Sequence, residues 1–125
     1  MMLFKPLMML PLALFMLTDI LGNAEQDIYQ GLKDGNVKKI AAYFADNVSI
    51  TLRNETGYYS KFQSEMVLKE FLRNYRALDV KSVPVKNDKQ NYRTYEFVTS
   101  SSTFRVFVRF DIESDKIRIS ELRIE

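Results

Sequence analysis

The sequence predicts a single α+β domain in which a curved antiparallel sheet wraps around one long helix. Residues 92–125 alternate apolar and polar side chains at every second position, a period that is typical of strands with one buried face. Residues 60–75 instead carry apolar side chains at helical spacing, and they predict the longest helix of the chain. A chain of 125 residues, of which 46% are hydrophobic, fits one hydrophobic core.

The composition excludes several kinds of chemistry. The chain has no cysteine, which excludes disulfides and thiolate metal sites, and no histidine, the commonest metal ligand and general base near neutral pH. Its 18 basic and 16 acidic residues are dispersed, and the longest basic cluster is the pair Lys38-Lys39, so we expect no nucleic-acid partner. The acidic residues do not form a metal-binding loop either. We therefore expect no cofactor and no metal.

The N-terminal segment has the three-part layout of a signal peptide. Lys5 supplies a positive charge, and Leu7–Leu17 is an almost unbroken apolar run. The small residues Gly22 and Ala24 then stand at the positions that a signal peptidase requires for cleavage after Ala24.

This layout predicts that residues 1–24 are removed and that residues 25–125 form a secreted or periplasmic domain, with no stable membrane span after cleavage. A retained membrane anchor is one alternative, but an anchor needs roughly 18–20 apolar residues, and Thr18 and Asp19 interrupt the run early. A buried N-terminal helix is the other alternative.

The first half of the mature domain predicts two helices and a strand. Residues 25–34 space their apolar side chains as one face of a helix, which ends at Asp34-Gly35-Asn36 because glycine favours the left-handed conformation of a helix end. Residues 37–44 predict a second helix. Residues 47–54 alternate as a half-buried strand, and Glu55-Thr56-Gly57 predicts the turn after it.

The long helix has a recognisable start. Ser60, followed three residues later by Gln63, forms a capping box, in which the two side chains satisfy free backbone N–H groups. The helix is expected to run to about Tyr75. Residues 78–85 predict a weaker strand at an edge or a bulge, because Pro84 cannot donate a hydrogen bond to a neighbouring strand.

Residues 92–125 predict three antiparallel strands. A loop at Ser101-Ser102 would place Tyr95 opposite Val108, Phe97 opposite Val106 and Thr99 opposite Phe104. A turn near Ser114-Asp115 would pair opposite charges, Asp111 with Arg118 and Glu113 with Lys116. The expected inner wall under the long helix consists of Tyr95, Phe97, Phe104, Val106, Val108 and Phe110.

The apolar pattern changes parity near the end of the chain. Ile117 and Ile119 face inward, and then Leu122 and Ile124 do so. One extra residue near Ser120-Glu121 explains the change as a β-bulge, and bulges bend a sheet.

Two stretches carry a resemblance to a known superfamily. Leu32–Asn36 and Ala42–Val48 are similar to the opening of the nuclear-transport-factor-two-like proteins, in which two helices precede the first strand of a cone-shaped α+β fold. Tyr58–Glu65 with Leu68–Leu72, and the closing Leu122–Glu125, look like a family of secreted bacterial proteins that is known only as a domain of unknown function. The resemblance covers nearly the whole mature chain and implies a fold, not an activity.

The superfamily contains both enzymes and non-catalytic modules. In its ketosteroid-isomerase-like members, the resemblance implies a catalytic aspartate at about Leu52 and a tyrosine at about Ile28, and neither residue matches. Tyr29 is one residue from the second position, but that offset turns a helical side chain by about 100°. Dehydratase-like members use a histidine, which this chain lacks.

The tyrosines are the best candidates for polar groups in an apolar pocket. We expect a ligand pocket to draw on Tyr29, Tyr58, Tyr95 and Phe97. The alternative is that the tyrosines lie at the edge of the core, with their hydroxyls in contact with water or the backbone.

Arg105, Phe107 and Arg109 are candidates for a protein interface, because they share the outer face of one expected strand and a phenylalanine in the middle of a sheet face suits an interface. The alternative is a solvated face with weak charge pairs.

The sequence therefore favours a secreted, non-catalytic module that binds a small apolar ligand or a protein. One alternative is an isomerase- or dehydratase-type enzyme that uses a tyrosine and a carboxylate. The other is a structural homodimer that pairs through the sheet.

Overall fold

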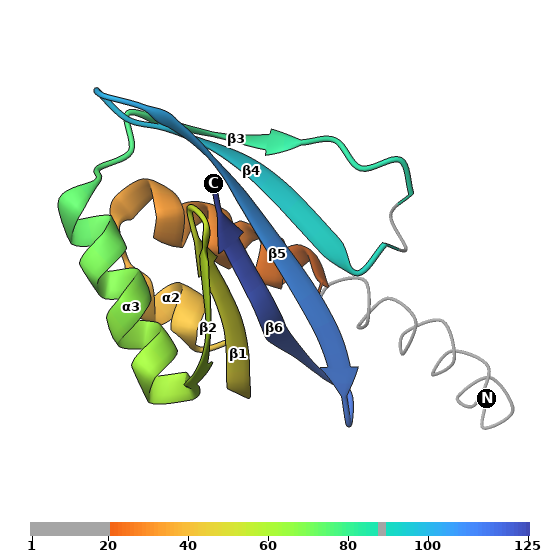
Figure 1. Cartoon of the computed structure of the whole chain (residues 1–125). Helices are drawn as coiled ribbons and strands as arrows, with labels where there is room; N and C mark the ends of the chain where they lie inside the picture. Colours follow the sequence, from red (N-terminus) through yellow and green to blue (C-terminus); the bar gives the residue numbers. More distant parts are fainter. Residues whose placement is uncertain (1–20, 88–89) are drawn as a thin grey trace, which may run out of the picture.

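The structure, a computed structural model, describes residues 21–87 and 90–125 and confirms the α+β fold (Figure 1). The described helices are an N-terminal helix over residues 21–34, α2 (Val37–Ala41) and α3 (Lys61–Asn74). The strands are β1 (Phe44–Leu52), β2 (Glu55–Ser60), β3 (Asp79–Val83), β4 (Tyr92–Val98), β5 (Thr103–Glu113) and β6 (Lys116–Ile124).

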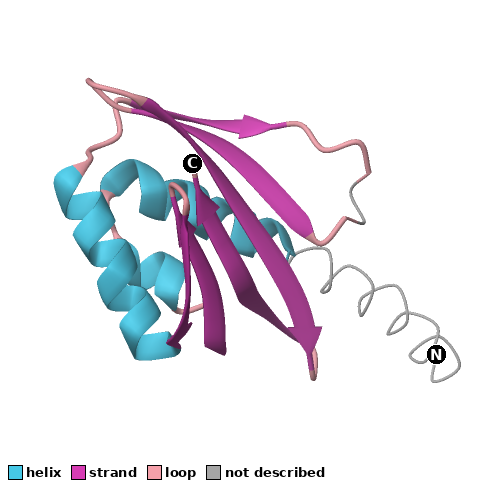
Figure 2. Cartoon of the chain, in the orientation of Figure 1, coloured by secondary structure: helices cyan, strands magenta, loops and turns pink. Residues whose placement is uncertain are grey.

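These strands form one sheet in the order β2-β1-β6-β5-β4-β3. The sheet curves around the helices, which all lie against the same face (Figure 2). Neighbouring strands are antiparallel except β1 and β6, which are parallel, so the sheet is mixed rather than purely antiparallel as expected. The edge position expected for the strand over residues 78–85 is confirmed, because β3 is the last strand in the order, although β3 ends at Val83 and does not include Pro84.

Phe71, in the second half of α3, fixes this helix to the sheet. Its ring lies 5.9 Å from that of Phe97 and 5.2 Å from that of Phe104, measured between centroids. The N-terminal helix covers another part of the same face, where it contacts Tyr95. The expected inner wall is confirmed, because all of its residues are buried: Tyr95, Phe97, Phe104, Val106, Val108 and Phe110.

Several local expectations are also confirmed. Ser60 accepts a hydrogen bond from the backbone N–H of Gln63, and the Gln63 side chain accepts one from the backbone N–H of Ser60, as a capping box requires. The register between β5 and β6 changes at Ser120, which is left without a partner on β5. Before that bulge, the predicted charge pairs are in register: Asp111 opposite Arg118 and Glu113 opposite Lys116.

The predicted register between β4 and β5 is wrong by two residues. Phe97 lies opposite Phe104, not Val106, because Thr99 pairs with Ser102 and closes the turn one residue earlier than expected. The Thr99 hydroxyl stabilises this turn by donating to the carbonyl oxygen of Ser102 and accepting from its N–H. A shift by two residues leaves every side chain on the same face, so the inner wall is unchanged.

The predicted boundaries around β1 are also wrong. The second helix ends at Ala41, not Phe44, and Phe44 begins the strand because it pairs with Ile119 of β6. Residues 55–57 are not a turn but part of β2, which pairs with β1. Gly57 belongs in that strand for a steric reason, since a Cβ atom there would lie 2.6 Å from the Tyr59 ring.

Replacing Ser60 or Ser64 of the α3 region by alanine is expected to change the stability of the domain in opposite directions. Ser64 is fully buried, and its hydroxyl has no hydrogen-bond partner among the described residues, which costs about 1–3 kcal/mol. We expect Ser64→Ala to raise the free energy of unfolding by about 1 kcal/mol. Ser60→Ala removes the cap and is expected to lower it by about 1 kcal/mol.

Urea denaturation of both variants and of the parent chain measures these changes. A loss of stability in Ser64→Ala would show that the hydroxyl is hydrogen-bonded in solution.

Candidate functional site

An apolar groove of about 730 Å³ lies between α3 and the end of the β1–β2 hairpin. We call it the α3 groove. Val67, Phe71 and Tyr75 follow one another at four-residue intervals and therefore share one side of α3. The lining is completed by Leu52, Arg53, Tyr59, Met66, Glu70, Asn74 and Ile124.

The polar groups of this groove lie at its rim. Arg53 stands in the hairpin turn with a positive φ of 57°, and its backbone N–H donates to the carbonyl oxygen of Ile124 at 2.7 Å. Its guanidinium Nη2 donates to the Tyr75 hydroxyl, also at 2.7 Å. On the helix, Glu70 accepts two hydrogen bonds from Arg73, at 2.6 and 2.7 Å.

The positions at which the resemblance implies catalytic groups are apolar in the structure. Leu52 lines the α3 groove, and Ile28 is 1% exposed in the core. No aspartate or glutamate is buried in the described parts of the chain, where the buried polar residues are Thr51, Ser64, Arg93 and Thr99.

None of the four residues expected to line a pocket is part of the lining of the α3 groove. Tyr58 is 83% exposed on β2, whereas Tyr95 and Phe97 are buried in the core. Tyr29 is half-buried on the N-terminal helix, with the Lys33 ammonium 5.8 Å from its ring centroid.

Tyr59 and Tyr75 are the tyrosines of the groove. A strand over residues 55–60 would place the side chains of Tyr58 and Tyr59 on opposite faces of the sheet, and this alternation is the signal that could have identified Tyr59. Nothing in the sequence indicates that Arg53 reaches Tyr75.

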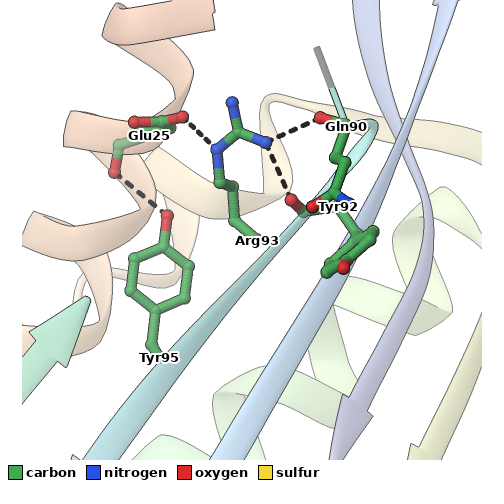
Figure 3. A network of polar contacts seen from close by, with 5 residues as sticks. All are labelled: Glu25, Gln90, Tyr92, Arg93 and Tyr95. Carbon is green, nitrogen blue, oxygen red and sulfur yellow. Dashed lines mark hydrogen bonds and ion pairs between the residues drawn. The ribbon is translucent and has the colours of Figure 1, made fainter. Parts of the chain in front are cut away.

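Tyr95 instead belongs to a polar cluster, the N-terminal clamp, which consists of Glu25, Arg93 and Tyr95 (Figure 3). The Glu25 carboxylate pairs with the Arg93 guanidinium, and the Tyr95 hydroxyl donates to the backbone carbonyl oxygen of Glu25 at 3.4 Å. Arg93 also donates to the carbonyl oxygens of Gln90 and Tyr92, at 2.7 and 2.8 Å. The clamp ties the N-terminal helix to β4.

Burial, and then the nearby charge of Glu25, raise the pKa of Tyr95 above its usual value, so its hydroxyl stays protonated and acts as a donor. A small pocket of about 290 Å³ adjoins the clamp and reaches β3 at Ser82 and Val83.

A second tyrosine–carboxylate contact joins Tyr43 to the N-terminal helix. The Tyr43 hydroxyl donates to Asp27 Oδ2 at 2.5 Å. Partial burial and this carboxylate raise the pKa of Tyr43 to about 12, so the tyrosine is neutral at physiological pH. Neither residue lines the α3 groove, and we interpret the contact as a tie between helix and sheet.

The interface candidates lie on the outer face of β5, away from the helices. The Phe107 ring stacks on Tyr92 at 5.3 Å between centroids, and the guanidinium groups of Arg109 and Arg123 lie 5.6 and 6.0 Å from its centroid. Arg109 also pairs with Glu121 at 3.1 Å. Phe107 is therefore partly covered within its own chain, while Arg105 is exposed.

A larger pocket, of about 770 Å³, lies between α3 and the turn that follows the N-terminal helix. Exposed charged side chains make up much of its lining, which suits a solvated surface better than a binding site: Lys33, Asp34, Lys38, Lys69, Arg73 and Arg76. The α3 groove is smaller but more apolar, as ligand sites usually are.

No helix within residues 21–87 and 90–125 is long and apolar enough to cross a membrane. The apolar run Leu7–Leu17, on which the signal-peptide prediction depends, lies outside the described residues.

Comparisons with solved structures show the same fold. A DUF4783 family protein from Bacteroides uniformis is 22% identical, with a TM-score of 0.73 over 80% of this chain and 94% of that chain. A protein of unknown function with a cystatin-like fold from Nostoc punctiforme is 13% identical, with a TM-score of 0.61 over 86% of this chain and 89% of that chain. A variant of a protein named Rd1NTF2_05 is 14% identical, with a TM-score of 0.59 over 83% and 98%.

No curated protein matches the chain. The model of DUF4783, a domain of unknown function, matches residues 25–125. The resemblance to nuclear-transport-factor-two-like proteins and to a family of unknown function is thus confirmed. The chain belongs to the DUF4783 family.

Proposed function

We propose that this protein is an exported, non-catalytic binding module whose α3 groove takes up the apolar part of a ligand. The observation that carries the proposal is the groove itself, which holds about 730 Å³ and is lined mainly by aliphatic and aromatic side chains. Its volume falls within the range of about 300–1,000 Å³ that is usual for ligand sites. Because Met66 remains 48% exposed at its edge, a ligand there would remove apolar surface from water.

The groove supports binding better than catalysis. Glu70 is the carboxylate of its lining, but the Glu70 side chain is 59% exposed and held by Arg73. A general base of the isomerase type needs a carboxylate within reach of the proton that it removes, and Leu52 occupies the position at which the resemblance implies one.

An uncharged fluorescent probe, N-phenyl-1-naphthylamine, tests the groove. We expect its fluorescence to rise on binding to the parent chain, and Val67→Trp to weaken binding at least tenfold because the indole fills the groove. Phe62→Ser is the matched control, since Phe62 is exposed on the same helix but does not line the groove.

Thermal unfolding shows whether each variant is folded, and Met66→Lys, at an exposed position, serves as a second blocking variant. Probe binding that is unchanged in both blocking variants would disprove the proposed site.

Export is the second part of the proposal, and it requires removal of residues 1–24. The match of the family model from residue 25 supports a mature chain that begins at Glu25.

We expect the protein recovered from the periplasm or medium of a bacterial host to begin at Glu25, as measured by intact-mass spectrometry. A full-length chain in the membrane fraction would instead support the retained anchor.

A homodimer through the outer face of the sheet is a second candidate, which the cluster around Phe107 favours. Arginine and aromatic side chains are enriched in protein interfaces, and here Tyr92, Arg109 and Arg123 surround one phenylalanine. We expect the exported chain to sediment as a dimer at tens of micromolar, and Phe107→Glu to sediment as a monomer. A monomeric parent chain at that concentration would exclude a stable sheet dimer.

A further inference from the structure

We propose that the ligand of the α3 groove is a single-chain carboxylic acid, whose apolar chain lies along the groove and whose carboxylate binds at the Arg53–Tyr75 pair. This inference rests on the proposed function, because it assumes that the groove binds an apolar ligand. It adds the chemical class of that ligand.

The rim of the groove carries one cation without a counter-charge. Arg53 has no carboxylate within ion-pair distance among the described residues. Its backbone is fixed in the hairpin turn by the hydrogen bond to Ile124, and its guanidinium is held at the rim by Tyr75. An arginine that is held in this way binds an anion at a lower cost in side-chain entropy than a freely moving one does.

The hydrogen bond between the two residues also determines what Tyr75 offers a ligand. Its oxygen accepts from Arg53, so its own O–H is directed elsewhere and can donate. The remaining guanidinium N–H groups are donors as well. The pair therefore presents donors to the groove, and a carboxylate, which only accepts, is the matching ligand group.

The other charges near the groove do not cancel this preference. Glu70 is also part of the lining, but its two oxygens are bound by Arg73, so this pair adds no net charge. Arg53 alone then gives the rim a single positive charge. A phosphate monoester carries about −1.5 to −2 charges at neutral pH and would remain partly uncompensated, whereas a carboxylate carries one.

The rest of the groove accommodates the apolar chain. Phe71, Leu52 and Ile124 line it alongside the ring of Tyr59. Each methylene group buried there contributes about 0.8 kcal/mol, which corresponds to about a fourfold gain in affinity. The length of the apolar chain and the charge of the head group thus contribute separately to the affinity of the ligand.

Titration of the exported, ¹⁵N-labelled protein with octanoate and with 1-octanol, followed by NMR, tests the inference. We expect octanoate to bind at least tenfold more tightly than 1-octanol, because the alcohol cannot pair with the Arg53 cation. Hexanoate, which is two methylene groups shorter, should bind more than tenfold less tightly than octanoate. The largest amide shifts are expected at Leu52, Arg53 and Tyr75.

Variants of Arg53 and Tyr75 distinguish the contribution of the positive charge to binding from that of the side-chain shape. Arg53→Gln should reduce the affinity for octanoate to that for 1-octanol and leave 1-octanol unchanged, while Arg53→Lys should restore part of the difference. Tyr75→Phe should weaken octanoate binding a few-fold. Arg76→Gln is the matched control, because Arg76 is exposed beyond the same end of α3 and does not line the groove.

Each outcome either supports or overturns the inference. Equal affinities for octanoate and 1-octanol, or an equal effect of Arg53→Gln on both, would overturn it and leave the apolar groove intact as the proposed function. Tighter binding of octyl phosphate than of octanoate would overturn the carboxylate class. If the acid, the alcohol and the uncharged probe all fail to bind, the proposed function itself fails.

Discussion

The contact of Phe71 with Phe97 and Phe104 is the interaction on which the rest of the structure depends. It joins the second half of α3 to β4 and β5, near the outer end of a sheet whose other end, β2, leads directly into the same helix. A helix held at both ends of a curved sheet cannot slide along it. Aromatic pairs of this kind add about 0.5–1.5 kcal/mol to the burial of their area, and they also fix the orientation of the helix.

This constraint explains where the α3 groove lies. The β1–β2 hairpin and the end of β6 approach α3 from the other side, and the space that remains forms the groove. Tyr75 contacts both Phe71 and Phe104 and extends the aromatic cluster to the rim of the groove. There its hydroxyl accepts a hydrogen bond from Arg53. The ring that completes the core is therefore also the ring that presents a polar group to the groove.

The sequence predicted the parts of the fold that local chemistry determines. The Ser60–Gln63 cap, the inner wall of β4 and β5 and the bulge at Ser120 follow from neighbouring residues or from a period of two. It did not predict the parallel pairing of β1 with β6, because these strands are far apart in the chain and carry no local signal of their direction. The sequence indicates a turn at Gly57, because glycine is common in turns. A glycine that is needed in a strand to make room for a tyrosine ring cannot be distinguished from a turn glycine by sequence.

The candidate site was less predictable for the same reason. The apolar character of Leu52 was evident, but the rim depends on Arg53 and Tyr75, which are 22 residues apart and meet only after the sheet has closed against α3. Tyr95, one of the residues expected to form a pocket, instead makes a polar contact with the N-terminal helix. The spacing of residues in the sequence does not show whether a tyrosine hydroxyl contacts another part of the chain or a ligand.

The central position of β6 has a consequence for the order in which the domain is completed. β6 lies between β1 and β5, so a chain that has not yet delivered its last strand has two separate partial sheets, β1–β2 and β3–β4–β5, with no strand to join them. Contacts between such distant segments form late and slowly. The sheet of a nascent chain therefore stays open between β1 and β5 until β6 has been added.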